Sequence, residues 1–328
     1  MLAAASFNQY IAADVALSHA RLLRAMGRLP YRHVHRALLG LTWLETWLRW
    51  PLKTLNIQDS LHETFSLIDP DGRRFGLTDQ VRAGFRKNML YYQVPDLVVL
   101  LNGLDRRRFR KQALTVENKE VLLRARERGP GAIVVGFRIG AYSAMPWALA
   151  SLGFPVSFIV GTEPLAKMGR ALGKTFVPQF TKRIRFLSAQ DPRVLAQSLE
   201  HLNGGGLVCT MLEMSPLEFE KTTEVRFLGW NVQVPYGISY LSAATRRSIL
   251  PAVITREAGP RFRLSFEEPI PAPERDRASI LENTQQLYRV LERKALEFPE
   301  QWVGWILLAS HMGIDLEAPT SGRVLALF

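Results

Sequence analysis

The sequence is poor in the residue types that would tie it to a disulfide or to a bound metal. Its 328 residues include a single cysteine, Cys209, which has no second cysteine to pair with. The six histidines do not combine with it at the spacings of a zinc site. We therefore expect a reducing compartment such as the cytoplasm, no metal and no cofactor.

Long hydrophobic runs are also missing. The longest stretch without a charged residue lies between Arg138 and Glu163, and glycines and prolines divide it as turns do. The first residues lack the early basic region of a secretory signal. We predict neither a membrane span nor a signal peptide.

Acidic residues are fewer than basic ones: the chain has 30 Asp and Glu against 42 Lys and Arg, which gives a net charge of +12. Up to Lys53 the chain has seven basic residues and only two acidic ones. Such an excess suits an acidic protein, an anionic membrane surface or a nucleic acid. We do not expect nucleic acid, because no recognised binding motif is present and the aromatic residues do not alternate as stacking platforms.

Three tryptophans recur at helical spacing within this basic region, Trp43, Trp47 and Trp50. Indoles flanked by basic residues suit the headgroup boundary of an anionic membrane. We therefore treat them as candidate membrane contacts on the inner face of the cell membrane. The alternative is that they pack this helix onto the rest of the protein.

The pattern of apolar residues predicts an α/β fold. Residues 1–55 and about 78–113 favour helix, with breaks at Pro30 and Pro51 and a turn at 69–73. Beyond residue 131, short apolar strands alternate with helices, which is typical of a largely parallel sheet. The strands are expected at 132–137, 155–160, 183–187 and 206–211, and the helices at 141–152, about 164–172 and about 192–202.

The remaining chain is expected to complete the same sheet. We predict an irregular stretch at 213–235, a helix near 237–246, strands at 250–256 and 261–267, a helix at 277–297 and a tail from about 313. The fold class is α/β, a single domain with a largely parallel central sheet flanked by helices, plus a helical N-terminal arm. We place the arm and its helical layer at 1–114 and the α/β domain at 115–328.

Four segments carry a family resemblance when they are taken in order. Residues 131–156 end in Leu-Gly-Phe-Pro-Val, and residues 204–213 close on an acidic residue, Glu213. The third and fourth segments are residues 225–237 and 298–302. Over roughly residues 60–305 they resemble the lipid A late acyltransferases, the lauroyl and myristoyl transferases of the lysophospholipid acyltransferase superfamily. The resemblance implies an acyl thioester donor, on acyl carrier protein or coenzyme A.

The resemblance fails at the catalytic residues. Family members carry a histidine, four further residues and then Asp or Glu where the first strand turns into its helix. Aligned by the surrounding residues, those two positions are Arg138 and Ser143. A guanidinium stays protonated, so Arg138 cannot serve as the general base, and a serine cannot orient a base as a carboxylate does.

Other roles are open to the residues at this place. Arg138 could bind a phosphate or carboxylate at the end of its strand, or form a structural ion pair with Glu213. Glu213 could be a general base if burial raised its pKa, or could hold the loop. Ser143 could be a nucleophile beside a base, or could serve the start of the helix. Tyr142 and Tyr236 could contact an acyl chain or headgroup, or could be ordinary packing.

Two functions follow. The first is an atypical acyltransferase that moves an acyl group from a carrier-protein or coenzyme A thioester to a lipid, amine or hydroxyl acceptor without the usual histidine. An acceptor that is already nucleophilic would need less help from a base. The alternative is a catalytically inactive protein of the same fold that binds a carrier protein or lipid as a partner subunit.

Overall fold

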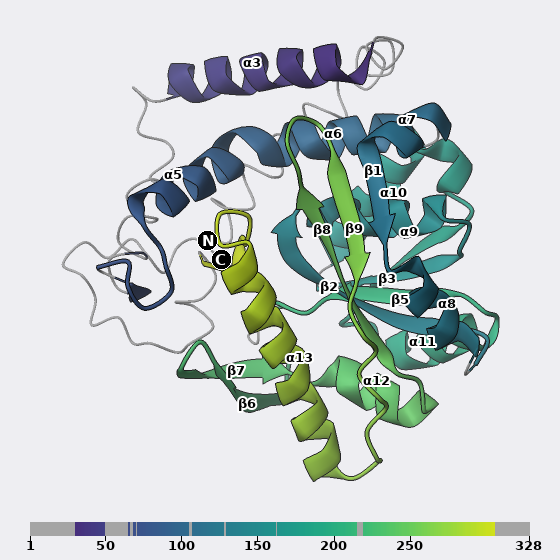
Figure 1. Ribbon diagram of the computed structural model, residues 1–328. Coiled ribbons are helices and arrows are strands. Elements are labelled where there is room, and N and C mark those ends of the chain that lie inside the picture. The colour runs from purple at the N-terminus through teal and green to yellow at the C-terminus, as the bar shows by residue number, and fades with distance from the viewer. Residues whose placement is uncertain are drawn as a thin grey trace.

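The computed structural model describes residues 30–49, 65, 68–69, 71–104, 107–127, 129–161, 163–214 and 219–305. Its centre is a seven-stranded sheet in the order β1-β9-β8-β2-β5-β3-β4 (Figure 1). Neighbouring strands are parallel except β8 and β9, which pair antiparallel. The strands are β1 Leu114–Glu117, β2 Ala132–Gly140, β3 Val156–Val160, β4 Ile184–Ser188, β5 Leu207–Met211, β8 Ile249–Arg256 and β9 Phe262–Phe266. The predicted α/β fold with a largely parallel sheet is confirmed.

The central strand β2 is buried on both faces. Ala132 and Val134 point into one apolar core, whereas Ile133 and Val135 point into the other, as the two-residue period of a strand requires. Both faces of a mostly parallel sheet are normally covered by helices, which is why this strand has no polar side.

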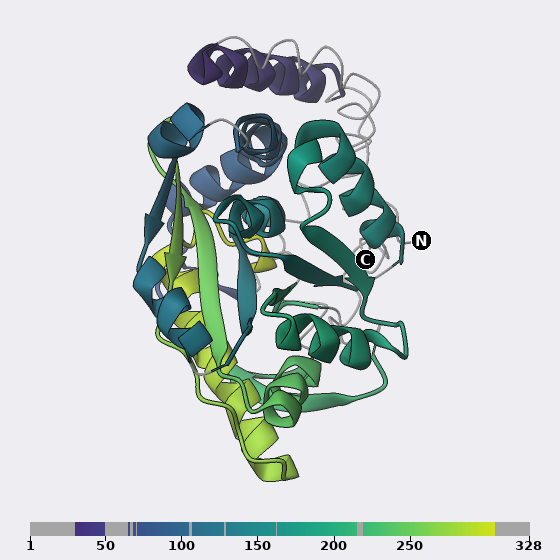
Figure 2. The ribbon, with the colours of Figure 1, turned by 90° about the vertical axis from the view of Figure 1, so that its right-hand side faces the viewer.

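Helices form the layers on the two faces. One core joins the sheet to α3, α6, α9 and α10, and the other joins it to α13. Figure 2, turned by 90°, shows that α3 is an outer layer in this view as well. The helices are α3 Tyr31–Arg49, α5 Asp79–Lys87, η2 Asn88–Tyr92 (a π-helical turn), α6 Gln93–Gly103, α7 Arg107–Ala113, α8 Lys119–Glu127, η3 Tyr142–Ala144, α9 Met145–Ser151, α10 Glu163–Phe176, η4 Pro178–Phe180, α11 Val194–Asn203, α12 Gly237–Thr245 and α13 Arg277–Glu297. None of the helices in the described ranges has the length and apolar character that a bilayer span requires.

The N-terminal helices begin and end where the sequence signals predicted. The helix α3 starts directly after Pro30 and ends before Pro51. The side chain of Thr78 caps α5 by accepting a hydrogen bond from the Val81 N–H. The turn at 69–73 closes with a hydrogen bond from the Gly72 N–H to the Asp69 carbonyl. The other predicted helical residues of the arm, and the predicted tail, lie outside the described residues.

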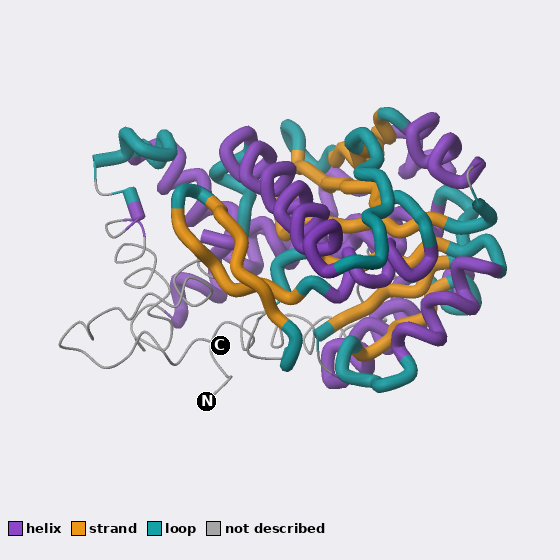
Figure 3. Tube along the Cα trace, turned by 90° about the horizontal axis from the view of Figure 1, so that it is seen from below, coloured by secondary structure: helices purple, strands orange, loops and turns teal. Residues whose placement is uncertain are grey.

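The prediction of an irregular stretch at 213–235 was wrong. Strands β6 Thr222–Phe227 and β7 Trp230–Pro235 form an antiparallel hairpin beside α13 (Figure 3). Leu228 and Gly229 make its two-residue turn, and both have positive φ. Leu-Gly is an uncommon sequence for such a turn. The alternation of buried residues that marks the two strands is nevertheless present: Val225, Phe227, Val232 and Val234.

Candidate functional site at the carboxyl end of strand β2

The last residues of β2 pair with a segment from the far end of the described chain. The Gly140 N–H donates to the Gln301 carbonyl at 3.0 Å, and the Val303 N–H donates to the Arg138 carbonyl at 2.9 Å. Gly140 has a φ of +58°, and a Cβ there would lie 2.3 Å from the Ile254 carbonyl oxygen. Only glycine fits this place, and the resulting bend leads β2 into η3.

The Glu213 side chain hydrogen-bonds to both of the segments that meet at the end of β2. Its carboxylate accepts the Arg138 N–H at 3.0 and 3.2 Å through its two oxygens, and the Trp302 indole N–H at 2.9 Å. Glu213 is 5% exposed and Trp302 is 1% exposed. Burial raises the pKa of Glu213 above its ordinary value, while the charge of Arg138 and the hydrogen bond from Trp302 oppose that rise. The Glu213 carboxylate thus connects the end of β2 to Trp302 in the segment that pairs with it.

The Arg138 side chain lies close enough to Glu213 to act on its charge, but the two are not in ion-pair contact. The guanidinium is half-buried, and the described chain provides it with no hydrogen bond. Burial also raises the pKa of the nearby Tyr288 hydroxyl; the Glu213 carboxylate adds to the rise and Arg138 opposes it. Arg138 is therefore the half-buried cation beside the buried Glu213 and Tyr288 side chains.

The remaining predicted site residues are less closely associated. Ser143 is half-buried on η3, where no other described residue hydrogen-bonds its hydroxyl, and it does not cap α9. Tyr142 is buried in the apolar core beside it. Tyr236 precedes α12 and is half-buried, and no described hydrogen bond joins its side chain to Arg138, Ser143 or Glu213. The structure therefore brings Arg138 and Glu213 together, with Tyr142 and Ser143 following on the next turn.

A second polar cluster was not predicted from the sequence. His35 Nε2 lies 3.0 Å from Asp96 Oδ1, so α3 and α6 meet through a buried histidine–carboxylate pair. Arg256, the last residue of β8, donates to the other Asp96 oxygen and to Asn88 Oδ1. Its guanidinium also lies 4.0 Å from the centre of the Tyr92 ring. The sequence gives no local signal for this cluster, because 61 residues separate His35 from Asp96 and 160 separate Asp96 from Arg256.

Gln301 links the two clusters. Its side-chain amide donates to the Arg256 carbonyl at 3.0 Å and accepts the Arg256 N–H at 2.7 Å, while its own carbonyl accepts the Gly140 N–H. Gln301 and Trp302 belong to the segment 298–302 that carried part of the resemblance, although the sequence assigned neither a role. Both clusters thus lie at the same edge of the sheet.

Of the three tryptophans predicted to contact membrane, the structure describes one side chain. Trp43 is 57% exposed on α3, and its neighbour Leu44 is 44% exposed. It is not packed against the α/β domain. The Trp47 side chain and all of Trp50 lie outside the described residues.

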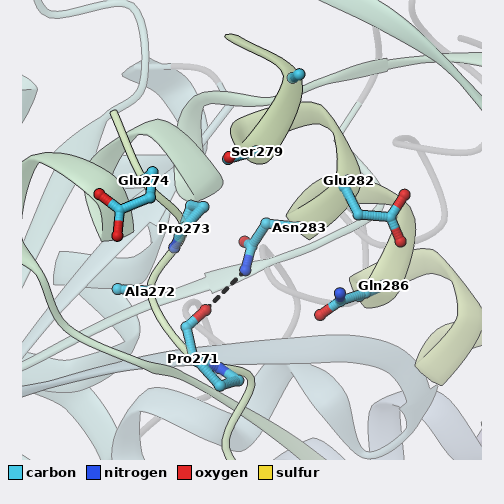
Figure 4. A pocket seen from close by; sticks show the side chains of 9 residues that line it. Pro271, Ala272, Pro273, Glu274, Ser279, Glu282, Asn283 and Gln286 are labelled. Atoms are coloured by element: carbon cyan, nitrogen blue, oxygen red, sulfur yellow. Dashed lines mark hydrogen bonds between the residues drawn. The ribbon is translucent and has the colours of Figure 1, made fainter. Parts of the chain in front are cut away.

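Among the described residues one hollow lies apart from both clusters, with a volume of about 530 Å³. Figure 4 shows it at the start of α13, where Asn283 Nδ2 donates to the Pro271 carbonyl at 2.9 Å. Its ionisable residues are Glu274 and Glu282, and it contains no base–nucleophile pair. Within the described part of the chain, no three His, Cys, Asp or Glu side chains come together as a metal-binding set.

A doubly covered, mostly parallel sheet with polar side chains gathered at its carboxyl edge is the architecture of α/β enzymes that bind ligands at that edge. The family model described as bacterial lipid A biosynthesis acyltransferase matches residues 104–308. The chain belongs to this acyltransferase family. A search of curated proteins finds no match.

Proposed function

We propose that the protein transfers an acyl group from a thioester, carried by acyl carrier protein or coenzyme A, to a lipid, amine or hydroxyl acceptor. We further propose that it does so without a base at the residue where the family carries its histidine. Membership of the acyltransferase family supports transfer in general. The observation that carries the proposal is the Arg138 guanidinium, whose donors are not used by the described chain at the carboxyl end of β2.

Arg138 is suited to bind an anion and not to move a proton. Its guanidinium stays charged and presents several N–H donors to a phosphate or carboxylate. The Glu213 carboxylate, on which the Arg138 charge acts, is held by the Arg138 backbone and by Trp302. We therefore propose that Arg138 holds the phosphate of the phosphopantetheine arm or of an acceptor headgroup, and that Glu213 positions Arg138.

An acidic carrier protein fits the outer edge of the sheet beside β4. Lys167 on α10 is exposed there. Three basic residues in or directly before β4 are exposed as well: Lys182, Arg183 and Arg185. Positive potential of this kind accelerates and orients the encounter with an acidic partner.

Replacement of Arg138 by glutamine tests the anion-binding role. In a steady-state transfer assay we expect the KM for the substrate that supplies the anion to rise about 10- to 100-fold, because charged hydrogen bonds contribute about 1.5–3 kcal/mol. We expect kcat to change less than about 3-fold, since the guanidinium takes no part in proton transfer.

Arg289→Gln is the matched control, because that arginine forms an exposed ion pair with Glu282 on α13. It should leave both constants unchanged. An Arg138→Gln enzyme with unaltered KM for both donor and acceptor would contradict the proposed role.

A non-catalytic partner subunit is the second candidate. It is favoured by one observation: no described residue forms a hydrogen bond that could activate the Ser143 hydroxyl. On that alternative the wild-type protein would bind acyl-loaded carrier tightly and never release the acyl group.

The outer face of α3 supports a peripheral position on an anionic membrane. Arg32, Arg36 and Trp43 are exposed at intervals of four and seven residues, and Leu44 lies beside them. An exposed indole near basic side chains is typical of helices that lie at the headgroup boundary. We propose that this face rests on the bilayer that contains the lipid acceptor.

Replacing Trp43 by serine should weaken binding to phosphatidylglycerol-containing vesicles about 10- to 100-fold at low salt, since burying a large apolar side chain contributes roughly 1.5–3 kcal/mol. Vesicle sedimentation measures the change. Tyr240→Ser removes a similarly exposed aromatic from α12 and is expected to have no effect. Equal binding of the wild type and the Trp43 variant would exclude this face as the contact.

A further inference from the structure

The His35–Asp96 pair has the geometry of an oriented base. One imidazole nitrogen, Nε2, is held by the Asp96 carboxylate at 3.0 Å, and no hydrogen bond of the described chain engages the other nitrogen, Nδ1. A carboxylate on one nitrogen fixes the tautomer and stabilises the imidazolium that forms when the other nitrogen takes a proton. His35 and Asp96 are 4% and 1% exposed, so the pair is also largely shielded from water.

The surrounding groups hold this pair in place. Arg256 compensates the buried Asp96 charge from the side opposite to His35. Asn88 and Tyr92 position Arg256 through a hydrogen bond and through the ring face, and both belong to the π-helical turn η2. Such turns occur frequently at functional sites because they shift side chains out of the regular helical positions.

The Asp96–Arg256 side of this cluster lies near the two positions that the resemblance aligns with the family's catalytic residues, Arg138 at the end of β2 and Ser143 on η3. Gln301 contacts both Arg256 and Gly140, and η3 packs against α6, which carries Asp96, and against β8. The Ala141 N–H donates to the Ile254 carbonyl at 2.9 Å, two residues before Arg256. Figure 1 shows α3 lying over α6, at the end of the molecule where β8 turns into β9.

We propose that His35, oriented by Asp96, is the general base of acyl transfer. This inference rests on the proposed function and names the residue that replaces the missing histidine. His35 Nδ1 accepts the proton of the acceptor's hydroxyl group while the oxygen of that hydroxyl forms a bond to the thioester carbonyl carbon. The tetrahedral intermediate then breaks its C–S bond, and the imidazolium returns the proton to the departing sulfur. The products are an ester and a free thiol, and His35 is neutral again.

The test compares His35→Gln with wild type. Glutamine can still donate to Asp96 but cannot take a proton at physiological pH. For a hydroxyl acceptor we expect kcat to fall about 10²- to 10⁴-fold, the usual contribution of a general base. For hydroxylamine, a nucleophile that attacks without prior deprotonation, the rate should stay within about 3-fold of wild type. His33→Gln is the matched control, because His33 is exposed on the same helix.

Each outcome decides the role of His35. Selective loss with the hydroxyl acceptor supports the base. Equal loss with both acceptors, accompanied by a lower melting temperature, would make His35 a structural contact between α3 and α6 and would overturn the inference. An undiminished rate in the variant would overturn it as well and leave the proposed function intact. Wild-type protein that transfers to neither acceptor would overturn the proposed function and this inference together.

Discussion

Replacing Glu213 by alanine is expected to lower the free energy of unfolding by about 2–5 kcal/mol. The change leaves the Arg138 N–H and the Trp302 indole N–H buried without an acceptor, and each such group costs about 1–3 kcal/mol. It also opens a cavity between β2 and the segment that pairs with its end. Denaturation in urea measures the loss. A change below about 1 kcal/mol would contradict the anchoring role.

Two further variants separate the parts of this effect. Trp302→Phe removes the N–H together with the five-membered part of the indole, and keeps a six-membered ring against Phe227 and Trp305. Combined with Glu213→Ala it should cost less than the sum of the two single losses, because both remove the same hydrogen bond.

Glu213→Gln tests the charge. Because burial raises the folded-state pKa of Glu213 above its unfolded value, the contribution of this carboxyl to stability should be largest at low pH and fall as the pH rises beyond the ordinary carboxyl range. The difference in free energy of unfolding between the wild type and Glu213→Gln should change by at most about 1.4 kcal/mol per pH unit at pH values above the ordinary carboxyl range.

Asp96→Ala is expected to lower the free energy of unfolding by about 3–5 kcal/mol. Asp96 is 1% exposed and holds both His35 and Arg256, so its removal leaves a largely buried guanidinium without its carboxylate. Breaking one side of a buried ion pair costs this much because the other charge remains uncompensated. The measurement is again urea denaturation.

The double replacement Asp96→Leu with Arg256→Met is the control for that explanation. With both charges gone, much of the lost stability should return, since apolar residues of similar volume often replace a buried pair without cost. If the double variant is as unstable as the single one, uncompensated charge is not the cause.

The sheet could be predicted because its signals are local. Strand β2 contains a run of apolar residues bounded by glycines, and the helices that follow have regular apolar spacing. The hairpin β6–β7 was missed because Leu-Gly at 228–229 does not signal a tight turn, even though the strands alternate. Strand β1 is only four residues long and depends on its parallel pairing with β9, which no local pattern reveals.

The site was only partly predictable for the same physical reason. Arg138 and Glu213 were found because the family resemblance points to both, and because Arg138 follows a predicted strand; the parallel pairing of β2 with β5 places both residues at one edge. Trp302 reaches Glu213 from 89 residues away, and the His35–Asp96 pair depends on how α3 packs on α6. Contacts of that kind are set by tertiary packing, which a single sequence does not display.

Intact-mass spectrometry of acyl-loaded carrier protein incubated with the wild-type chain tests the central claim most directly. The experiment needs three arms: carrier with protein alone, with a lipid hydroxyl acceptor added, and with an amine acceptor added. We expect the carrier to lose its acyl mass only when an acceptor is present, over many turnovers per protein molecule. A carrier that binds tightly but keeps its acyl group in all three arms would contradict the claim and identify a non-catalytic binding partner.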